Sequence, residues 1–263
     1  MRRDALKGIR AKQATHAGLW LDKFYHAKEA KTDKDSELKH LLTEQVSEIA
    51  EPPVYKDFYE NRWLPMLKAC GADCREAEVS GRMIVGLGGE SVLENSITLH
   101  RTYGVPYIPG TALKGLARRF ANPKKVSGWT PEHSLIVFGN EKNQDDARSG
   151  YITFYDALYV PGTGRIGGKQ SALYEDVMTV HHQKYYMDDN VPPADWDDPI
   201  PVPFISATGK YLIALAASDM EESNRKGWFS AIFDLLELAL KEEGVGAKTS
   251  SGYGRMTLGK SSC

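Results

Sequence analysis

The chain has 263 residues, of which 41% are hydrophobic, so it is long and apolar enough for one large domain or for a domain with an extension. Its formal net charge is −2. A chain this close to neutral is not a polycation, so any surface that binds nucleic acid has to be local and balanced by acidic surface elsewhere.

Two further features indicate the cellular setting. No stretch approaches about 18 consecutive apolar residues, the length of a membrane-spanning helix, and residues 1–20 lack the apolar segment and cleavage site of a secretion signal. The three cysteines, an odd number in a long chain, fit reduced thiols better than a disulfide framework. We therefore expect a soluble, non-secreted, cytoplasmic protein that does not bind a membrane.

Residues 1–78 are predicted to form a helical N-terminal extension. Residues 4–28 are weakly amphipathic, and residues 36–50 carry leucine, valine and isoleucine at helical spacing. A third apolar helical stretch covers residues 56–70, in which Pro65 is expected to kink or end the helix.

The predicted character of the chain changes after residue 74. Residues 77–89 predict a strand that ends in a glycine-rich turn, and residues 90–110 predict a long loop. A helix then opens in "VPYIPGTALKGLARRF", residues 105–120, whose apolar residues fall at i, i+3, i+4 and i+7. Thr111 is the expected N-cap, because its hydroxyl can accept a hydrogen bond from an unpaired backbone N–H.

The charge at the start of this helix is unusual. Helix N-termini favour acidic side chains, because the backbone dipole leaves a partial positive charge there. Between Glu94 and Glu132 the sequence has no acidic residue, but it has several basic ones: Arg101, Lys114, Arg118, Arg119, Lys124 and Lys125. This concentration of positive charge predicts an anion-binding site at the helix.

The rest of the chain predicts a strand at 150–160, a strand or hairpin arm at 173–186, and a hairpin at 202–218 with Gly209 near its turn. A helix at 227–244 ends at Gly244 in the C′ position, and a strand closes the chain. The order strand, helix, strands, helix, strand predicts an α+β fold with a ferredoxin-like (RRM-like) βαββαβ core and hairpin insertions. The predicted domains are residues 1–78 and 79–263.

A second glycine cluster, "GVGAKTSSGYGR", occupies residues 244–255. It is not a nucleotide-binding P-loop, because Ala247 precedes Lys248 where a glycine is needed, and because the segment follows a helix and opens a strand. Glycines still let backbone N–H groups approach a phosphate chain, and a lysine with hydroxyls can complete an anion cradle. We therefore predict that this loop binds the phosphate backbone of a ligand, without a cofactor.

Other chemistry has weaker support. His181 and His182 could form the base of a metal-independent ribonuclease centre, although neighbouring residues of a strand point to opposite faces. Cys70 and Cys74 lack the second cysteine pair of a zinc site. We expect no metal. Tyr253 in the C-terminal loop could stack on an RNA base.

Residues 80–258 resemble the RAMP superfamily of CRISPR-associated proteins. The resemblance rests on "PYIPGTALKGLAR", which is similar to the family's proline-glycine-Ser/Thr-x-x-Lys-Gly-x-x-Arg motif, and on the glycine-rich loop near the C-terminus. Within the superfamily the chain is most similar to the sixth-subunit family of type III-B (Cmr) effector complexes. The first motif covers Gly110, Thr111, Lys114 and Arg118, and the second covers Gly246, Lys248, Gly252 and Gly254.

The resemblance implies a non-catalytic subunit of an RNA-guided interference complex in antiviral defence. Such a subunit binds guide RNA toward its 3′ end, contacts the guide–target duplex, and lies among backbone, small and capping RAMP subunits. An insertion after the second strand can press on the guide–target duplex, and residues 161–187 are the candidate for it. The alternative is a RAMP-type, metal-independent endoribonuclease that processes guide RNA.

Residue types and motifs together predict one RNA-binding site and no catalytic residues. The predicted RNA-binding residues are Gly110, Thr111, Lys114, Arg118, Arg119, Gly244, Gly246, Lys248, Thr249, Gly252, Tyr253, Gly254 and Arg255.

Overall fold

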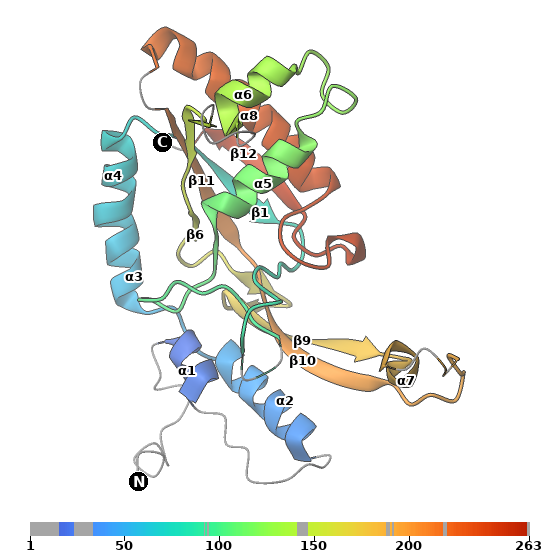
Figure 1. The fold of residues 1–263 in the computed structure, drawn as a ribbon. Coiled ribbons are helices and arrows are strands. Elements are labelled where there is room, and N and C mark those ends of the chain that lie inside the picture. The colour runs from blue at the N-terminus through green and yellow to red at the C-terminus, as the bar shows by residue number, and fades with distance from the viewer. Residues whose placement is uncertain are drawn as a thin grey trace.

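The computed structural model describes residues 16–23, 34–91, 93, 95–140, 147–187, 190, 192–217 and 220–261. Helices and antiparallel sheets are mixed along the chain, which confirms the predicted α+β class. Figure 1 shows a central sheet with helices on both sides and a long two-stranded arm that projects from its lower end.

The central sheet has six strands, and its hydrogen-bonded order is β12-β1-β11-β6-β2, with β5 also paired to β11. All of these pairs are antiparallel. The strands are β1 (Asp73–Val79), β2 (Tyr107–Ile108), β5 (Ile152–Phe154), β6 (Ala157–Tyr159), β11 (Lys210–Ala217) and β12 (Met256–Ser261).

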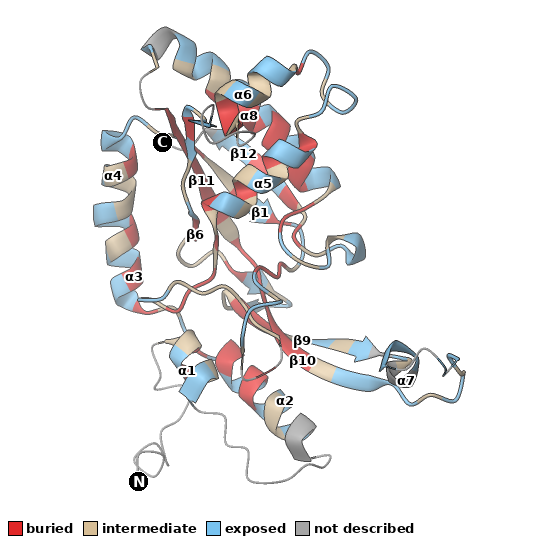
Figure 2. Ribbon diagram, in the orientation of Figure 1, coloured by how far each residue is buried: buried red, intermediate tan, exposed pale blue. Residues whose placement is uncertain are grey.

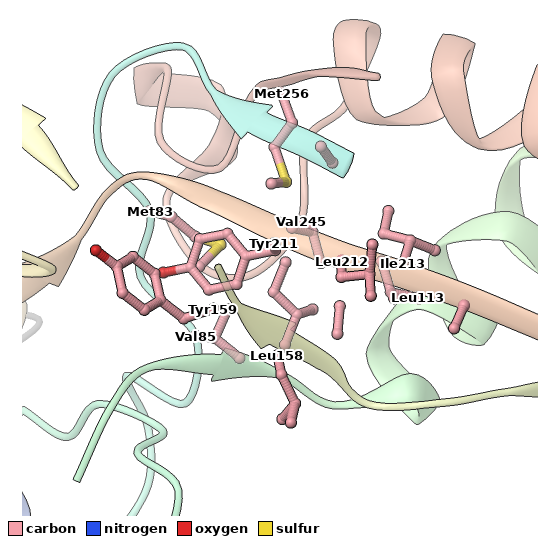
Figure 3. Packing of buried hydrophobic residues seen from close by; sticks show 14 of the residues in the cluster. Met83, Val85, Leu113, Leu158, Tyr159, Tyr211, Leu212, Ile213, Val245 and Met256 are labelled. Carbon is pink, nitrogen blue, oxygen red and sulfur yellow. The ribbon is translucent and has the colours of Figure 1, made fainter. Parts of the chain in front are cut away.

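Two helices pack against each other on one face of this sheet: α5 (Gly110–Phe120) and α8 (Glu222–Glu242). The core lies between them and β11, whose residues 211–217 are all buried (Figure 2). Figure 3 shows Leu113 of α5 beside Ile213 of β11. The predicted apolar stripe of α5 therefore meets the sheet, with Leu113, Ala117 and Phe120 buried and Leu116 half-buried.

The helical prediction for the N-terminal region is confirmed where the structure describes it. The helices are α1 (Ala17–Lys23), α2 (Lys34–Ser47), α3 (Pro53–Phe58), the π-helix η3 (Tyr59–Trp63) and α4 (Leu64–Ala69). Of the predicted stretch 4–28, residues 4–15 and 24–28 lie outside the described residues. Pro65 does not end the helical stretch: it lies in the first turn of α4, where its missing amide hydrogen costs little, and the π-helix comes directly before α4.

Two predicted strands have the wrong bounds. β1 ends at Val79, and beyond it Met83 forms only an isolated bridge with Ala207. The predicted strand 150–160 is divided into β5 and β6 by Tyr155 and Asp156, although the Tyr155 N–H still donates to the Ala214 carbonyl oxygen of β11 over 3.1 Å.

The predicted 202–218 hairpin is not a hairpin, because its two strands enter different sheets. β10 (Ile200–Ala207) pairs with β9 (Leu173–Val180) in the projecting arm, whereas β11 pairs within the central sheet. Gly209 joins them with a φ of 95°, and a Cβ at this position would lie 2.7 Å from the ring of Tyr159. The glycine therefore carries the chain from one sheet to the next rather than around a turn.

The remaining described elements are short. They are α6 (Pro131–Phe138), α7 (Gln183–Met187), η4 (Thr249–Ser251) and the paired strands β3 (Gly139–Asn140) with β4 (Arg148–Ser149), and β7 (Arg165–Ile166) with β8 (Lys169–Gln170). Within the described residues, every helix is too short or too polar to cross a lipid bilayer. Cys74 is disulfide-bonded and Cys70 is free, so the expectation of three reduced thiols is wrong.

Candidate nucleic-acid interface

The start of α5 is held by an acid from a distant part of the sequence. The backbone N–H of Gly110 donates to Asp156 Oδ1 over 2.7 Å. The N-cap is Pro109, which makes no side-chain cap, so the prediction that Thr111 caps the helix is wrong. Gly110 is buried, and a Cβ there would lie 2.1 Å from the Phe154 carbonyl oxygen. This glycine is required by the approach of β5.

Helix α5 has three faces, as expected from 3.6 residues per turn. The first is the apolar stripe in the core. The second consists of Ala112, Gly115, Leu116 and Arg119, which line a groove. The third consists of Thr111, Lys114 and Arg118 at i, i+3 and i+7, of which Thr111 and Arg118 are exposed and Lys114 is half-buried. The predicted cations of α5 therefore lie on two different faces.

Three glycines of the C-terminal loop are packed against this chain's own backbone. At Gly246 a Cβ would lie 2.1 Å from the Ile84 carbonyl oxygen, and at Gly254 it would lie 1.9 Å from that of Val245. Gly244 has a φ of 80° and confirms its predicted position just after the end of α8. Only Gly252, among the loop's four glycines, has nothing within 4 Å of a Cβ. Packing thus accounts for most of the glycine content of the loop.

Unpaired backbone N–H groups lie in the middle of the same loop. Lys248 has a left-handed conformation, with φ 55° and ψ 33°, and the short helix η4 follows it directly. In the described part of the chain, no acceptor is found for the N–H groups of Lys248, Thr249 and Ser250. A left-handed residue followed by right-handed ones turns successive N–H groups toward one side, which is the geometry of an anion-binding nest.

The fold brings the two predicted motifs together. A groove of about 530 Å³ is lined on one side by Gly115, Leu116 and Arg119 of α5. The other side comes from the end of α8 and from the loop, and its lining residues are Glu242, Glu243, Gly244, Val245, Gly246, Thr249, Ser250 and Arg255. Lys114, Arg118 and Lys248 do not line this groove. We call it the α5–loop groove.

Glu243 balances part of the positive charge of the acid-free segment between Glu94 and Glu132, although it lies outside that segment. Its Oε1 accepts a hydrogen bond from Lys125 Nζ, and its Oε2 lies 3.4 Å from Arg119 Nε. Lys125 also lies over the Phe120 ring, 4.4 Å from the centroid. The hydrogen bond from Lys125 is the largest cause that lowers the pKa of the Glu243 carboxyl. The acid-free window is therefore partly neutralised by a residue about a hundred positions downstream.

Two predicted side chains are held by this chain. Tyr253 donates its hydroxyl to Asp176 Oδ2 over 2.7 Å, and Arg82 Nη1 lies 2.8 Å from the same oxygen. Burial, followed by the bond to Asp176, raises the pKa of Tyr253 to about 12. Arg255 Nη1 donates to the Lys241 carbonyl oxygen over 2.8 Å, near the end of α8. Tyr253 thus ties the loop to strand β9, and Arg255 ties it to α8.

The histidine pair lies far from this groove, near the tip of the β9–β10 arm (Figure 1). His182 Nδ1 lies 3.1 Å from Asp197 Oδ2, and the same oxygen accepts the N–H of Ala194. Asp176, an acid on the neighbouring strand β9, is paired with Arg82 and Tyr253 and not with the histidines. The Asp197 contact joins the two sides of the tip. Among the described residues, no cluster of three or more histidine, cysteine or acidic side chains could hold a metal ion.

Replacing Glu243 by glutamine is expected to raise RNA affinity by about two- to fivefold at low salt, because it frees Arg119 and Lys125 for phosphates. The control is Glu237→Gln, an exposed acid on α8 outside the groove. Weaker RNA binding by Glu243→Gln than by the wild type in a filter-binding titration would contradict this role.

Glu243 also makes stability depend on pH. Because the folded pKa of Glu243 is lowered, its contribution to stability is present at neutral pH and is lost as the pH falls through that pKa.

Comparisons with known proteins agree with the pattern of motifs. The sequence model of the RAMP superfamily matches residues 76–257. CRISPR system Cmr subunit Cmr6 from Pyrococcus furiosus is 32% identical over 256 residues, covering 77% of this chain and 72% of the relative. A chain in the cryo-EM structure of the Type III-B Cmr-beta bound to cognate target RNA matches with a TM-score of 0.66 at 20% identity, covering 90% of this chain and 78% of that one. The crystal structure of Cmr6 from Pyrococcus furiosus matches with a TM-score of 0.44 at 29% identity, covering 71% and 97%.

Proposed function

The chain belongs to the RAMP superfamily, and on that premise we propose that it is a non-catalytic, RNA-binding subunit of a type III-B (Cmr) RNA-guided interference complex. In this role it holds the backbone of guide RNA toward the 3′ end, contacts the guide–target duplex, and binds neighbouring Cmr subunits in the cytoplasm. The 32% sequence identity to a Cmr6 protein, over most of both chains, supports the assignment of this chain to such a complex.

We infer a ferredoxin-like core from the element order β1, α5, β5 with β6, β11, α8 and β12. The central strand order β12-β1-β11-β6 places the last strand beside the first, as in a split βαββαβ arrangement. The predicted boundary between residues 1–78 and residues 79–263 falls inside β1. We propose that the RNA-binding domain includes the whole of β1 and that the residues before Asp73 form its extension. β1 is at the junction, since it pairs with both β11 and β12.

The α5–loop groove is the observation that carries the proposal. Gly115 is exposed in the middle of a helix, with nothing within 4 Å of a Cβ, so a ligand backbone can approach α5 closely there. The unpaired N–H groups of residues 248–250 and the guanidinium of Arg119 provide donors for phosphate oxygens. Gly110, Gly244, Gly246 and Gly254 shape the site, whereas Gly115 and Gly252 leave room for RNA.

Phosphate binding predicts a salt-dependent, sequence-independent effect of the flanking lysines. Lys248→Ala and Lys114→Ala should each weaken binding about equally for unrelated single-stranded RNAs. Each should also reduce the slope of log affinity against log salt by about 0.7. The control is Lys68→Ala, an exposed lysine on α4. If both variants have the same salt slope as the wild type, neither lysine contacts the RNA phosphates.

The ribonuclease alternative has one favourable contact, the pair of His182 with Asp197, in which a carboxylate orients an imidazole. We place no catalysis there, because Asp197 also accepts the N–H of Ala194 and so has a structural role at the tip of the arm. Guide-RNA cleavage by the isolated chain, lost in His181→Ala or His182→Ala, would overturn the non-catalytic proposal.

We propose that the projecting arm is the insertion that meets the guide–target duplex. The arm comprises β9, α7 and β10, residues 173–207, whereas the predicted range 161–187 includes only one of its strands. Two large side chains near the tip support a contact surface: Tyr186 is 74% exposed and Trp196 is 86% exposed. Helix α2 supports the base of the arm, where Thr43 donates to Glu175 of β9 over 3.0 Å.

A further inference from the structure

A second groove runs along the outer face of α8, separate from the RNA site. It has a volume of about 570 Å³ and lies between α8 and the segment that leads into α6. Its lining residues are Val126, Ser127, Gly128, Trp129, His133, Asn224, Gly227, Trp228, Ala231, Asp234, Leu235 and Leu238. We call it the α8 groove.

Aromatic side chains form one wall of the α8 groove. The His133 ring packs edge-on against Trp228 at a centroid distance of 5.5 Å and against Trp129 at 5.7 Å. Trp129 is buried and Trp228 is half-buried, so Trp228 presents part of its indole to the groove. A fixed, partly exposed tryptophan in a depression is the type of residue that anchors protein interfaces.

The floor of the α8 groove includes small residues whose size is not explained by packing within this chain. Gly227, Ala231 and Leu238 follow one outward stripe of α8, and Leu238 is 40% exposed. A glycine inside a helix costs about 1 kcal/mol relative to alanine, and nothing lies within 4 Å of a Cβ at Gly227. Packing within this chain therefore does not require the glycine, and its open position leaves room for another backbone to approach α8 closely.

The charge of the α8 groove distinguishes a protein from RNA. Among its lining residues the one with a formal charge at neutral pH is Asp234, whose side chain is 68% exposed. Arg75 Nη1 lies 4.0 Å from its Oδ1, at the limit of an ion pair. The α5–loop groove also has acids, but Arg119 and Arg255 accompany them, whereas no lysine or arginine lines the α8 groove. The Asp234 carboxylate therefore repels a phosphate backbone, and it attracts a lysine or arginine whose methylene stem can cover the indole of Trp228.

We propose that the α8 groove is the docking site for an apolar segment of a neighbouring protein subunit that carries a lysine or arginine. The inference rests on the proposed function, because it takes the neighbours to be the other proteins of the same complex. It separates the two roles of the chain: RNA lies along α5 and the C-terminal loop, and a protein packs on the outer face of α8.

The test is competitive assembly of the full-length chain. Wild-type and variant chains with different tags are co-expressed with guide RNA and the remaining Cmr subunits of the same host, and their incorporation is compared. Gly227→Trp should enter the complex at least about tenfold less than wild type, because the indole fills the groove. Asp234→Asn should also enter less well, whereas Glu237→Gln on an exposed face outside the groove should enter normally.

RNA affinity and unfolding temperature of the isolated variants are measured in parallel. Both should be unchanged in Gly227→Trp, because the position is open. Equal incorporation of Gly227→Trp and wild type would overturn the inference alone. Reduced RNA affinity of that variant would overturn it in favour of RNA in the groove. A wild-type chain that does not enter the complex would contradict the proposed function, and this inference with it.

Discussion

Tryptophan in place of Gly115 is expected to lower the affinity of the chain for single-stranded RNA by at least about tenfold, without unfolding it. The indole would occupy the α5–loop groove at the point where α5 faces Thr249 and Ser250. Loss of a single charge-assisted hydrogen bond to phosphate costs about 1.5–3 kcal/mol. Since about 1.4 kcal/mol corresponds to tenfold in affinity, one lost contact is enough for the predicted effect.

The fold should tolerate this change. Nothing lies within 4 Å of a Cβ at Gly115, and a mid-helix glycine is itself less favourable than most residues. Gly227→Trp is the matched control, because it places the same side chain at an equally open helical glycine in the α8 groove. Fluorescence anisotropy with one RNA compares the two. Equal RNA affinity of Gly115→Trp and wild type would show that RNA does not enter the α5–loop groove.

Alanine in place of Gly254 is expected to lower the free energy of unfolding by about 3 kcal/mol, through strain and steric conflict together. The residue has a φ of 71°, and the new Cβ would lie 1.9 Å from the Val245 carbonyl oxygen. Gly254 also accepts a hydrogen bond from the Val245 N–H and donates one to the Arg82 carbonyl oxygen. The backbone therefore cannot move aside without loss of those bonds.

Gly252→Ala is the matched control for Gly254→Ala. Gly252 has a similar left-handed φ of 92°, but nothing lies within 4 Å of its Cβ position. Its substitution by alanine should lower the free energy of unfolding by about 1 kcal/mol, because only the left-handed backbone conformation is unfavourable for alanine there. Urea denaturation measures both variants. A loss at Gly254 no larger than that at Gly252 would show that the loop is not packed as described.

Local patterns allowed the main elements of the fold to be predicted. The i, i+3, i+4, i+7 spacing in α5 correctly identified its buried stripe, because that spacing depends on one helix alone. Gly209 shows what a local sequence pattern cannot decide. A glycine with left-handed φ serves a turn and a crossing between sheets equally well, and only the pairing of β10 with β9 decides between them.

The candidate site was predicted as two motifs but not as one geometry. Helical spacing alone separates Arg119 from Lys114. Which of the two lines the groove depends on where α8 ends, and this could not be predicted from the sequence. Glu243 was missed because it is distant in sequence from Lys125. Gly115 was missed too, although an exposed glycine within a predicted helix is a signal that the sequence does contain.

The central claim is that the backbone N–H groups of the C-terminal loop and the facing side of α5 hold an RNA backbone. Amide hydrogen exchange of the full-length chain, with and without guide RNA, tests it most directly, because the amides of Lys248, Thr249 and Ser250 have no acceptor in the described part of the protein. We predict that RNA slows exchange at these three amides. Unchanged exchange there, with protection confined to residues 182–187 or to residues 224–238, would contradict it.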